Sequence, residues 1–237
     1  ESWLRRSRIV LMRAEQRMGA RVRAEIVAKL KGVYVIVDPE ATRGRDPVTV
    51  ARNTLEGGAR VIQLRNKQND KKQVLDQARR IKSLCQEHDV LFFVNDDADV
   101  ALTAGAHGLH VGQTDLPTEA ARSVLEPNQL IGRSNGNLPE ALASQAQEVD
   151  YIAIGPIYAT TTMGKSGRSA LGPEMVRLVK NAVPQPVVAI GGINAENLSE
   201  AVKAGADCVC IVSAITHADD PVEATRQLVN LFEEQSS

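Results

Sequence analysis

Long apolar runs are absent from this chain. No stretch of 18 or more apolar residues occurs among its 237 residues, so the sequence predicts no membrane-spanning segment. A large excess of either charge is also absent, because 28 Lys and Arg face 29 Asp and Glu, which leaves a net charge of −1. A protein without a basic excess has no general attraction to nucleic acid. A globular protein is the expected class, and the hydrophobic share of 43% suits one.

Cysteine and histidine are scarce, which limits disulfide and zinc chemistry. The three cysteines, Cys85, Cys208 and Cys210, are odd in number and lack the spacing of a disulfide framework. We therefore expect a reducing compartment and a cytoplasmic location. The four histidines include no His-x-x-x-His pair, so we expect no zinc site.

Methionine is missing from the first position, and the first residues differ in charge from the rest. We expect a fragment or a trimmed chain, and we leave open both an upstream domain and a homo-oligomer. Residues 1–31 carry nine Lys or Arg and three Glu, a net of +6 against −7 for the remainder. Apolar residues recur at helical spacing from Leu4 to Ile26, which predicts a basic amphipathic helical extension. It either packs on the following domain, caps its lower end or links upstream; Glu15 and Glu25 argue against a transit peptide.

Strand and helix patterns alternate over residues 32–237. Apolar runs predict eight buried strands, at 33–37, 60–64, 90–94, 108–111, from 130, 151–154, 187–190 and 208–212. Amphipathic patterns between and after them predict helices at 47–56, 69–88, 98–104, 119–125, 139–146, 173–181, from 194 and 221–234. Eight such units with short loops predict a single α/β domain, a (β/α)8 TIM barrel with an extra N-terminal helix. A doubly wound open sheet is the alternative, but the G-x-G-x-x-G typical after its first strand is absent.

A short internal repeat supports this register. The tripeptides at 58–60, 105–107 and 205–207 read Gly-Ala-Arg, Gly-Ala-His and Gly-Ala-Asp, and each ends a predicted helix just before a strand. The glycine supplies a left-handed cap, and the alanine packs closely where the strand begins.

Two glycines, Gly191 and Gly192, follow the seventh predicted strand. Their bare backbone N–H groups precede a helix for which we expect Asn194 as the N-cap. Exposed amides beside a helix N-terminus favour an anion site, and barrels often bind phosphate after their last two strands. The alternative is a tight turn without a binding role.

Cationic and amide side chains follow the second predicted strand. Gln63, Arg65 and Lys67 alternate along an extended chain and therefore share one face. Two cations and an amide on one face suit a polyanion such as diphosphate. The alternative is a solvated surface loop.

Carboxylates follow the third and fourth predicted strands. Asp96 and Asp115 belong to neighbouring strands of the barrel, so they can approach one another at its carboxyl end. Mg²⁺ binds through one or two carboxylates plus substrate phosphates, so we expect a magnesium site here. The alternative is that Asp96 and Asp97 cap the helix that begins near Ala98.

Hydroxyl groups gather after the fifth and sixth predicted strands. Ser134 follows the fifth strand, and the threonine run at 160–162 follows the sixth, beside the double glycine. This arrangement suits a second phosphate, whereas the alternative for the threonine run is a flexible surface loop.

The motifs together resemble a known family, thiamine phosphate synthase, from residue 32 to about residue 214. They are QLRNK at 63–67, NDD at 95–97, GLHVGQTDLP at 108–117, GPIYATTT at 155–162, VVAIGGI at 187–193 and IVSAI at 211–215. Their joint order is specific, although each motif alone is weak. The resemblance implies an enzyme that joins hydroxymethylpyrimidine diphosphate to a thiazole phosphate and releases pyrophosphate, with Mg²⁺ as cofactor.

The resemblance also implies roles for individual residues. The pyrimidine diphosphate site would be the stretch Gln63, Leu64, Arg65, Asn66 and Lys67, together with Asn95 and Ser134. The thiazole phosphate site would comprise Thr160, Thr161, Thr162, Gly192, Val212 and Ser213. Mg²⁺ would be bound by Asp96 and Asp115, and Arg65, Lys67 and Lys165 would assist the departure of pyrophosphate.

The chain departs from the family pattern at two places. A lysine usually follows the threonines, but Met163 stands there and Lys165 comes two residues later. A histidine is common where Gly136 follows Ser134 and Asn135. The missing histidine weakens the match to the related thiazole tautomerases more than to the synthases. Two alternatives stay open: a thiazole tautomerase-like isomerase, which would need no metal, and a barrel that binds phosphate ligands without catalysis, which the Met163 departure favours.

Overall fold

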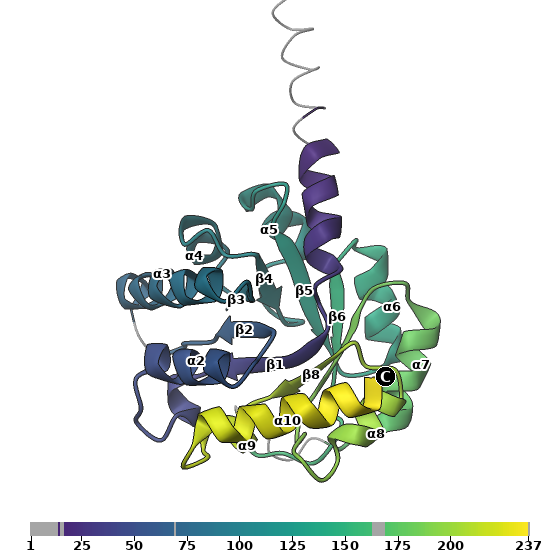
Figure 1. Ribbon diagram of the computed structural model, residues 1–237. Helices are drawn as coiled ribbons and strands as arrows, with labels where there is room; N and C mark the ends of the chain where they lie inside the picture. The colour runs from purple at the N-terminus through teal and green to yellow at the C-terminus, as the bar shows by residue number, and fades with distance from the viewer. Residues whose placement is uncertain (1–13, 15–16, 69, 163–168, 237) are drawn as a thin grey trace, which may run out of the picture.

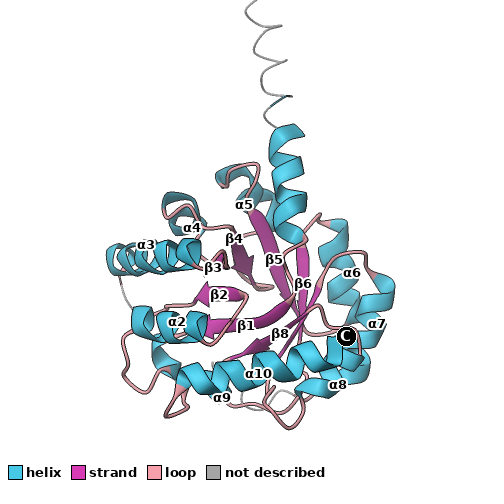
Figure 2. Ribbon diagram, viewed as in Figure 1, coloured by secondary structure: helices cyan, strands magenta, loops and turns pink. Residues whose placement is uncertain are grey.

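Eight parallel strands close into a barrel surrounded by helices (Figure 1), in a computed structural model that describes residues 14, 17–68, 70–162 and 169–236. Each strand pairs with the next in chain order, and β8 pairs with β1. Figure 2 shows the strands inside and the helices outside. The predicted (β/α)8 barrel is confirmed.

The strands lie where the apolar runs placed them. They are β1 Gly32–Val37, β2 Val61–Leu64, β3 Leu91–Asn95, β4 Gly108–Val111, β5 Leu130–Asn135, β6 Tyr151–Ile154, β7 Val187–Ile190 and β8 Cys208–Ile211. The helices are η1 Pro39–Ala41, α2 Pro47–Glu56, α3 Lys71–Glu87, α4 Ala98–Thr103, α5 Thr118–Val124, α6 Leu138–Ala146, α7 Pro173–Ala182, α8 Leu198–Lys203, α9 Ser213–Thr216 and α10 Pro221–Ser236. The sequence patterns did not predict η1 or α9, which are too short to show a helical period.

Helix starts follow local side-chain chemistry. Asp70 caps α3, because its side chain accepts a hydrogen bond from the backbone N–H of Gln73. The expectation for Asn194 is wrong: α8 begins at Leu198, and the Asn194 side chain accepts from the N–H of Glu196 at 2.9 Å. Asparagine readily forms such a local turn, which delays the start of the helix.

Three aromatic residues gather inside the barrel. Tyr34, Phe93 and Tyr151 are buried there, and the Phe93 and Tyr151 rings meet edge to face with centroids 5.3 Å apart. Gly108 and Gly132 make room for these rings, because a Cβ at either position would overlap Phe93 or Tyr151, respectively. A second apolar layer lies between the strands and the surrounding helices.

Residues 17–31 of the amino-terminal extension cover the amino end of the barrel, whereas residues 1–13 and 15–16 lie outside the described residues. Residues 17–27 are helical and are drawn in purple in Figure 1. Gly19 is buried against Pro127, and Arg23 forms an ion pair with Asp150 at 3.2 Å. Leu30 closes the barrel floor at 2% exposure. Of the packing alternatives, this segment caps the lower end. No helix within the described ranges could span a membrane.

Candidate active site

Two cavities open at the carboxyl ends of the strands, where barrel enzymes carry their chemistry. The first, here called the β2–β5 cavity, has a volume of about 500 Å³. Its lining includes Gln63, Arg65, Lys67, Asn95, Asp96, His110, Asp115 and Ser134. The second, the β6–β8 cavity, has a volume of about 860 Å³. Ile190 at the end of β7 lines both the first cavity and a small recess of the second.

The cationic side of the β2–β5 cavity is held by two ion pairs. The Arg65 guanidinium pairs with the Asp38 carboxylate, which is fully buried just after β1. The Lys67 ammonium lies 2.9 Å from the Asp96 carboxylate and remains half exposed. Both cations therefore face the cavity. The half-exposed Lys67 ammonium is accessible to an incoming anion.

Side-chain alternation divides the stretch at 63–67 between two environments. Gln63, Arg65 and Lys67 line the cavity, as their shared face predicted. Leu64 packs instead in the layer between strands and helices, and Asn66 donates a hydrogen bond to Gln77 of α3 at 2.8 Å. The structure does not bring the side chains of Leu64 and Asn66 into the cavity, because odd and even positions point to opposite faces.

The predicted carboxylate pair is brought together. Burial and the neighbouring Asp115 carboxyl raise the pKa of Asp96, against the lowering effect of Lys67. The Asp96 backbone has a φ of 62°, a left-handed conformation that turns its side chain over the end of β3. Asp115 is fixed by the N–H of Gly112, which donates to it at 2.7 Å.

The capping alternative for these aspartates has little support in the contacts. Asp97 occupies the N-cap position of α4, yet within the described part of the chain its side chain makes no capping hydrogen bond. Its carboxylate lies 3.2 Å from the Lys71 ammonium instead. Two acidic groups that repel one another at a cavity wall are suited to a divalent cation.

A buried chain of hydrogen bonds runs beneath the β2–β5 cavity. Gln63 donates to the Tyr34 hydroxyl at 2.6 Å, and the Tyr34 and Tyr151 hydroxyls are 3.0 Å apart. The Tyr151 hydroxyl is 2.8 Å from Nδ1 of His110, and Nε2 of His110 is 2.8 Å from the Ser134 hydroxyl. Burial raises the pKa of both tyrosines, so their hydroxyls stay neutral. This chain of hydrogen bonds holds the side chains of Gln63 and Ser134 in fixed orientations.

The sequence patterns did not identify the three residues in the middle of this chain of hydrogen bonds. Tyr34, His110 and Tyr151 sit inside strands, where they read as ordinary core residues. His110 lies within the GLHVGQTDLP motif, which was the one available signal. The recruitment of Tyr34 and Tyr151, 117 residues apart, depends on barrel closure.

An unsatisfied acceptor marks the floor of this cavity. The Oε1 atom of Gln63 is buried and has no hydrogen-bond partner among the described residues, while its residue is 1% exposed. A buried amide oxygen without a partner is costly, so a ligand N–H group that donates to it would be favoured. Ser134 lines the same cavity, so the cavity offers both an amide acceptor and a hydroxyl group to a polar ligand.

The β6–β8 cavity has the composition of a phosphate site. Its lining includes Thr160, Thr161, Thr162, Gly192 and Ser213, and Val212 lines the adjoining recess. The Thr162 and Ser213 hydroxyls lie 3.4 Å apart, which joins the loop after β6 to the end of β8. Lys165, together with Met163, lies outside the described residues.

Packing requires a glycine at position 192, whether or not an anion binds beside it. Its φ is 68°, in the left-handed region that favours glycine. A Cβ there would lie 2.6 Å from the carbonyl oxygen of Ala159 and 2.8 Å from Cβ of Tyr158. A side chain at Gly192 would therefore displace the loop after β6, rather than simply fill the space beside the amides.

An eight-stranded barrel with cations beside paired carboxylates in one cavity, and hydroxyls beside glycine amides in the next, defines a (β/α)-barrel enzyme of small anionic substrates. The family model described as thiamine monophosphate synthase matches residues 33–215. The chain belongs to this family.

Individual relatives agree with the family assignment. The thiamine-phosphate synthase of Methanospirillum hungatei is 38% identical over 201 residues, which cover 85% of this chain and 97% of the relative. That of Shouchella clausii is 41% identical over 207 residues, which cover 86% and 97%. The solved thiamine phosphate pyrophosphorylase of Pyrococcus furiosus is 36% identical, with a TM-score of 0.81 over 90% of this chain and 100% of that one.

Proposed function

We propose that this chain is a thiamine-phosphate synthase, a transferase that joins hydroxymethylpyrimidine diphosphate to a thiazole phosphate. The products are thiamine phosphate and pyrophosphate. The observation that supports this most directly is the Asp96–Asp115 pair beside the Lys67 ammonium, in a cavity that borders a second, hydroxyl-lined one. One anionic substrate fits each cavity.

The proposed reaction replaces one bond at the methylene carbon of the pyrimidine. The C–O bond to the diphosphate breaks, pyrophosphate leaves with the electron pair, and the lone pair of the thiazole nitrogen forms the new C–N bond. Arg65 and Lys67 stabilise the negative charge that develops on the leaving group. Since no side-chain nucleophile is required, the chain contributes positioning and electrostatics.

The floor of the β2–β5 cavity orients the pyrimidine in this proposal. The unpaired Oε1 of Gln63 accepts from the exocyclic amino group, and the Ser134 hydroxyl bonds a ring nitrogen. Tyr34, Tyr151 and His110 hold those two side chains in place. Asn95 lines the same cavity and completes the pyrimidine diphosphate site in this proposal.

The second substrate lies in the β6–β8 cavity. Its phosphate is held by the hydroxyls of the threonines at 160–162 and by backbone groups of Gly192, Val212 and Ser213. This anchor aims the thiazole nitrogen at the methylene carbon. Lys165 approaches the departing pyrophosphate in our proposal, in the role that Met163 cannot fill.

Mg²⁺ fits the donor set at Asp96 and Asp115. Two adjacent carboxylates, one of them with a raised pKa, are relieved by a divalent cation. No cluster of three or more His, Cys, Asp or Glu forms a metal site in the described ranges, so phosphate oxygens and water would complete an octahedral shell. When bound, Mg²⁺ supplies neutralisation of diphosphate charge.

The wider organisation follows the same proposal. We assign residues 1–31, part of which lies outside the described residues, as an amino-terminal extension and residues 32–237 as one catalytic barrel. A cytoplasmic location, a homo-oligomer and an upstream domain stay predictions.

The test supplies the purified chain with both substrates, with Mg²⁺ or with EDTA. A synthase consumes both and releases one pyrophosphate for each thiamine phosphate formed, and EDTA abolishes the reaction. Isomerisation of the thiazole without pyrophosphate would indicate a tautomerase. Binding of both ligands without turnover, in the presence of Mg²⁺, would indicate a non-catalytic barrel.

A further inference from the structure

Three side chains at the amino end of the barrel repeat one structural role. His107, Asp150 and Asp207 come directly before β4, β6 and β8. Each accepts a hydrogen bond from a backbone N–H near the start of the preceding strand, at 2.9, 2.7 and 2.7 Å respectively. Two of these positions close the Gly-Ala repeat found in the sequence.

Each of these acceptors also faces a cation from the helix that leads into that preceding strand. Arg122 of α5 lies 2.6 Å from Asp150, and Lys180 of α7 lies 2.5 Å from Asp207. Lys82 of α3 occupies the corresponding place, with its Nζ 3.3 Å from Nε2 of His107. His107 therefore places an imidazole before β4 at the position that a carboxylate occupies before β6 and β8.

The geometry of His107 determines which partner it offers to Lys82. Its Nδ1 accepts the N–H of Phe92 and so carries no proton. The proton of the neutral ring must then be on Nε2, the atom that faces Lys82. An ammonium group there would set two donors against each other, whereas an uncharged amine accepts from Nε2–H. Burial is the largest cause that lowers the pKa of His107, to about 4, and it keeps the ring neutral.

A cavity of about 270 Å³ lies beside this pair, between the N-terminal helix and α3. Its apolar walls include Val22, Ile26, Val90 and Leu91. Burial lowers the pKa of the Lys82 ammonium, and burial raises the pKa of the adjoining Cys85 thiol to about 12, so that the thiol is uncharged.

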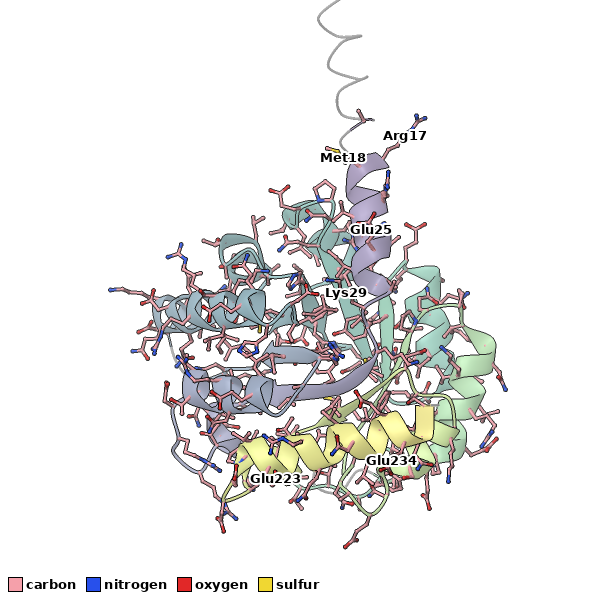
Figure 3. All side chains as sticks on the ribbon, in the orientation of Figure 1. Arg17, Met18, Glu25, Lys29, Glu223 and Glu234 are labelled. Carbon is pink, nitrogen blue, oxygen red and sulfur yellow. The ribbon has the colours of Figure 1, made fainter. Side chains whose placement is uncertain are left out.

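The other charged groups that line this cavity have ion-pair partners other than Lys82. Lys29 and Asp89 pair with one another at 2.8 Å, and Glu25 pairs with Arg21 at 3.3 Å. Figure 3 shows Glu25 on the helix that covers this end of the barrel and Lys29 near the end of that helix. Within the described ranges no carboxylate forms an ion pair with Lys82.

We propose that Lys82 is an Nε-acylation site for small acyl donors such as acyl phosphates. The lone pair of the neutral amine attacks the carbonyl carbon, the C–O bond to phosphate breaks, and phosphate leaves with that electron pair and with the proton lost from nitrogen. The product amide is uncharged, and its oxygen can accept from Nε2–H of His107. The site lies at the opposite end of the barrel from both cavities of the proposed active site.

Acetyl phosphate is the probe for this site. The full chain is incubated with it at neutral pH, and the acetylation rate of each lysine is measured by peptide mass spectrometry. Lys180 is the internal reference, because it is half-buried at the corresponding barrel position and ion-paired with Asp207. We expect Lys82 to react at least about tenfold faster, because only the uncharged amine is a nucleophile and the ion pair of Lys180 favours its charged form. A rate no higher than that of Lys180 would overturn the proposal.

Two variants separate the tautomer argument from simple exposure. His107→Asp gives Lys82 the carboxylate found in the other repeats, so its acetylation should fall to the Lys180 rate. His107→Gln keeps a neutral partner that accepts the Phe92 N–H and donates to Lys82, so the fast reaction should persist. Equal rates in both variants would contradict the mechanism. If a variant fails to fold by circular dichroism, the pH titration of the Lys82 ¹³Cε signal in the wild type decides: a midpoint no lower than that of Lys180 refutes it.

Discussion

Replacing Gly132 by alanine should damage both the stability and the site. Gly132 on β5 is in register with Tyr151 on β6, and an added Cβ would overlap the Tyr151 ring at Cζ, Cε1 and the hydroxyl. Carbon atoms pack at about 3.5–4.0 Å, so the ring must move by roughly 1 Å or more. That movement breaks the 2.8 Å contact with His110 and the 3.0 Å contact with Tyr34.

The expected loss has two parts. Overpacking of a core costs about 1–3 kcal/mol, and each buried polar group left unsatisfied costs about 1–3 kcal/mol. We expect a total of about 3–5 kcal/mol, which corresponds to a fall in Tm of roughly 6–20 °C for a domain of this size. Turnover should fall as well, since Ser134 loses its fixed partner His110.

Thermal unfolding followed by circular dichroism measures this effect. Gly136→Ala is the stability control, because its Cβ would lie 3.5 Å from Oε2 of Glu140, an ordinary contact. The decisive comparison is Gly132→Ala in a Tyr151→Leu background, where the ring is gone and the methyl group has room. If alanine at 132 destabilises both backgrounds equally, the clash with Tyr151 is not the cause.

Four further predictions concern the active site. Asp96→Ala and Asp115→Ala should each lower Mg²⁺-dependent turnover by at least about tenfold to a hundredfold in steady-state kinetics; full activity in either would remove that carboxylate from the proposal. The pKa of Asp96 in the folded protein is raised above its ordinary value of 3.8. Ionising Asp96 therefore costs more free energy in the folded state than in the unfolded state, so the metal-free fold loses stability as the pH rises from 3.8 through the raised pKa. Asp96→Asn should therefore raise the Tm at pH 7 without divalent cations, with the gain vanishing below about pH 3.8; a gain independent of pH would contradict this assignment. Arg65→Ala should weaken pyrimidine diphosphate binding by about 1.5–3 kcal/mol in calorimetry, and an equal loss for thiazole phosphate would argue against two separate sites. Lys165→Ala should slow single-turnover chemistry more than it weakens thiazole phosphate binding, and an unchanged rate at saturation would make Lys165 a bystander.

The order and number of strands were predictable from the sequence. Parallel strands covered on both faces are continuous apolar runs, such as 187–190, and glycine-containing helix ends separate them. Barrel topology then places every strand end on one rim, so Asp96 and Asp115 could be expected to meet before any contact was known. Side-chain alternation likewise placed Gln63, Arg65 and Lys67 on one face.

Local boundaries were less predictable because short-range alternatives compete. Asn194 satisfies its neighbours through a turn and postpones α8 to Leu198. The fifth strand continues to Asn135, through residues that read as its exit loop. Polar residues at the end of a strand resemble a loop in the sequence, because the partners that satisfy them lie on other elements. Ser134, for example, is hydrogen-bonded with His110 of β4.

By itself, the sequence determined the fold, the position of the two loops that we propose as anion sites, and the carboxylate pair, because these depend on periodicity and on the order of elements. Only the tertiary structure decided that Tyr34, Tyr151 and His110 form one hydrogen-bonded chain, and that Lys82 faces an imidazole where its counterparts face carboxylates. Those contacts join residues 117, 41 and 25 positions apart. Their geometry depends on strand register and barrel closure, which bring side chains together irrespective of their separation along the chain.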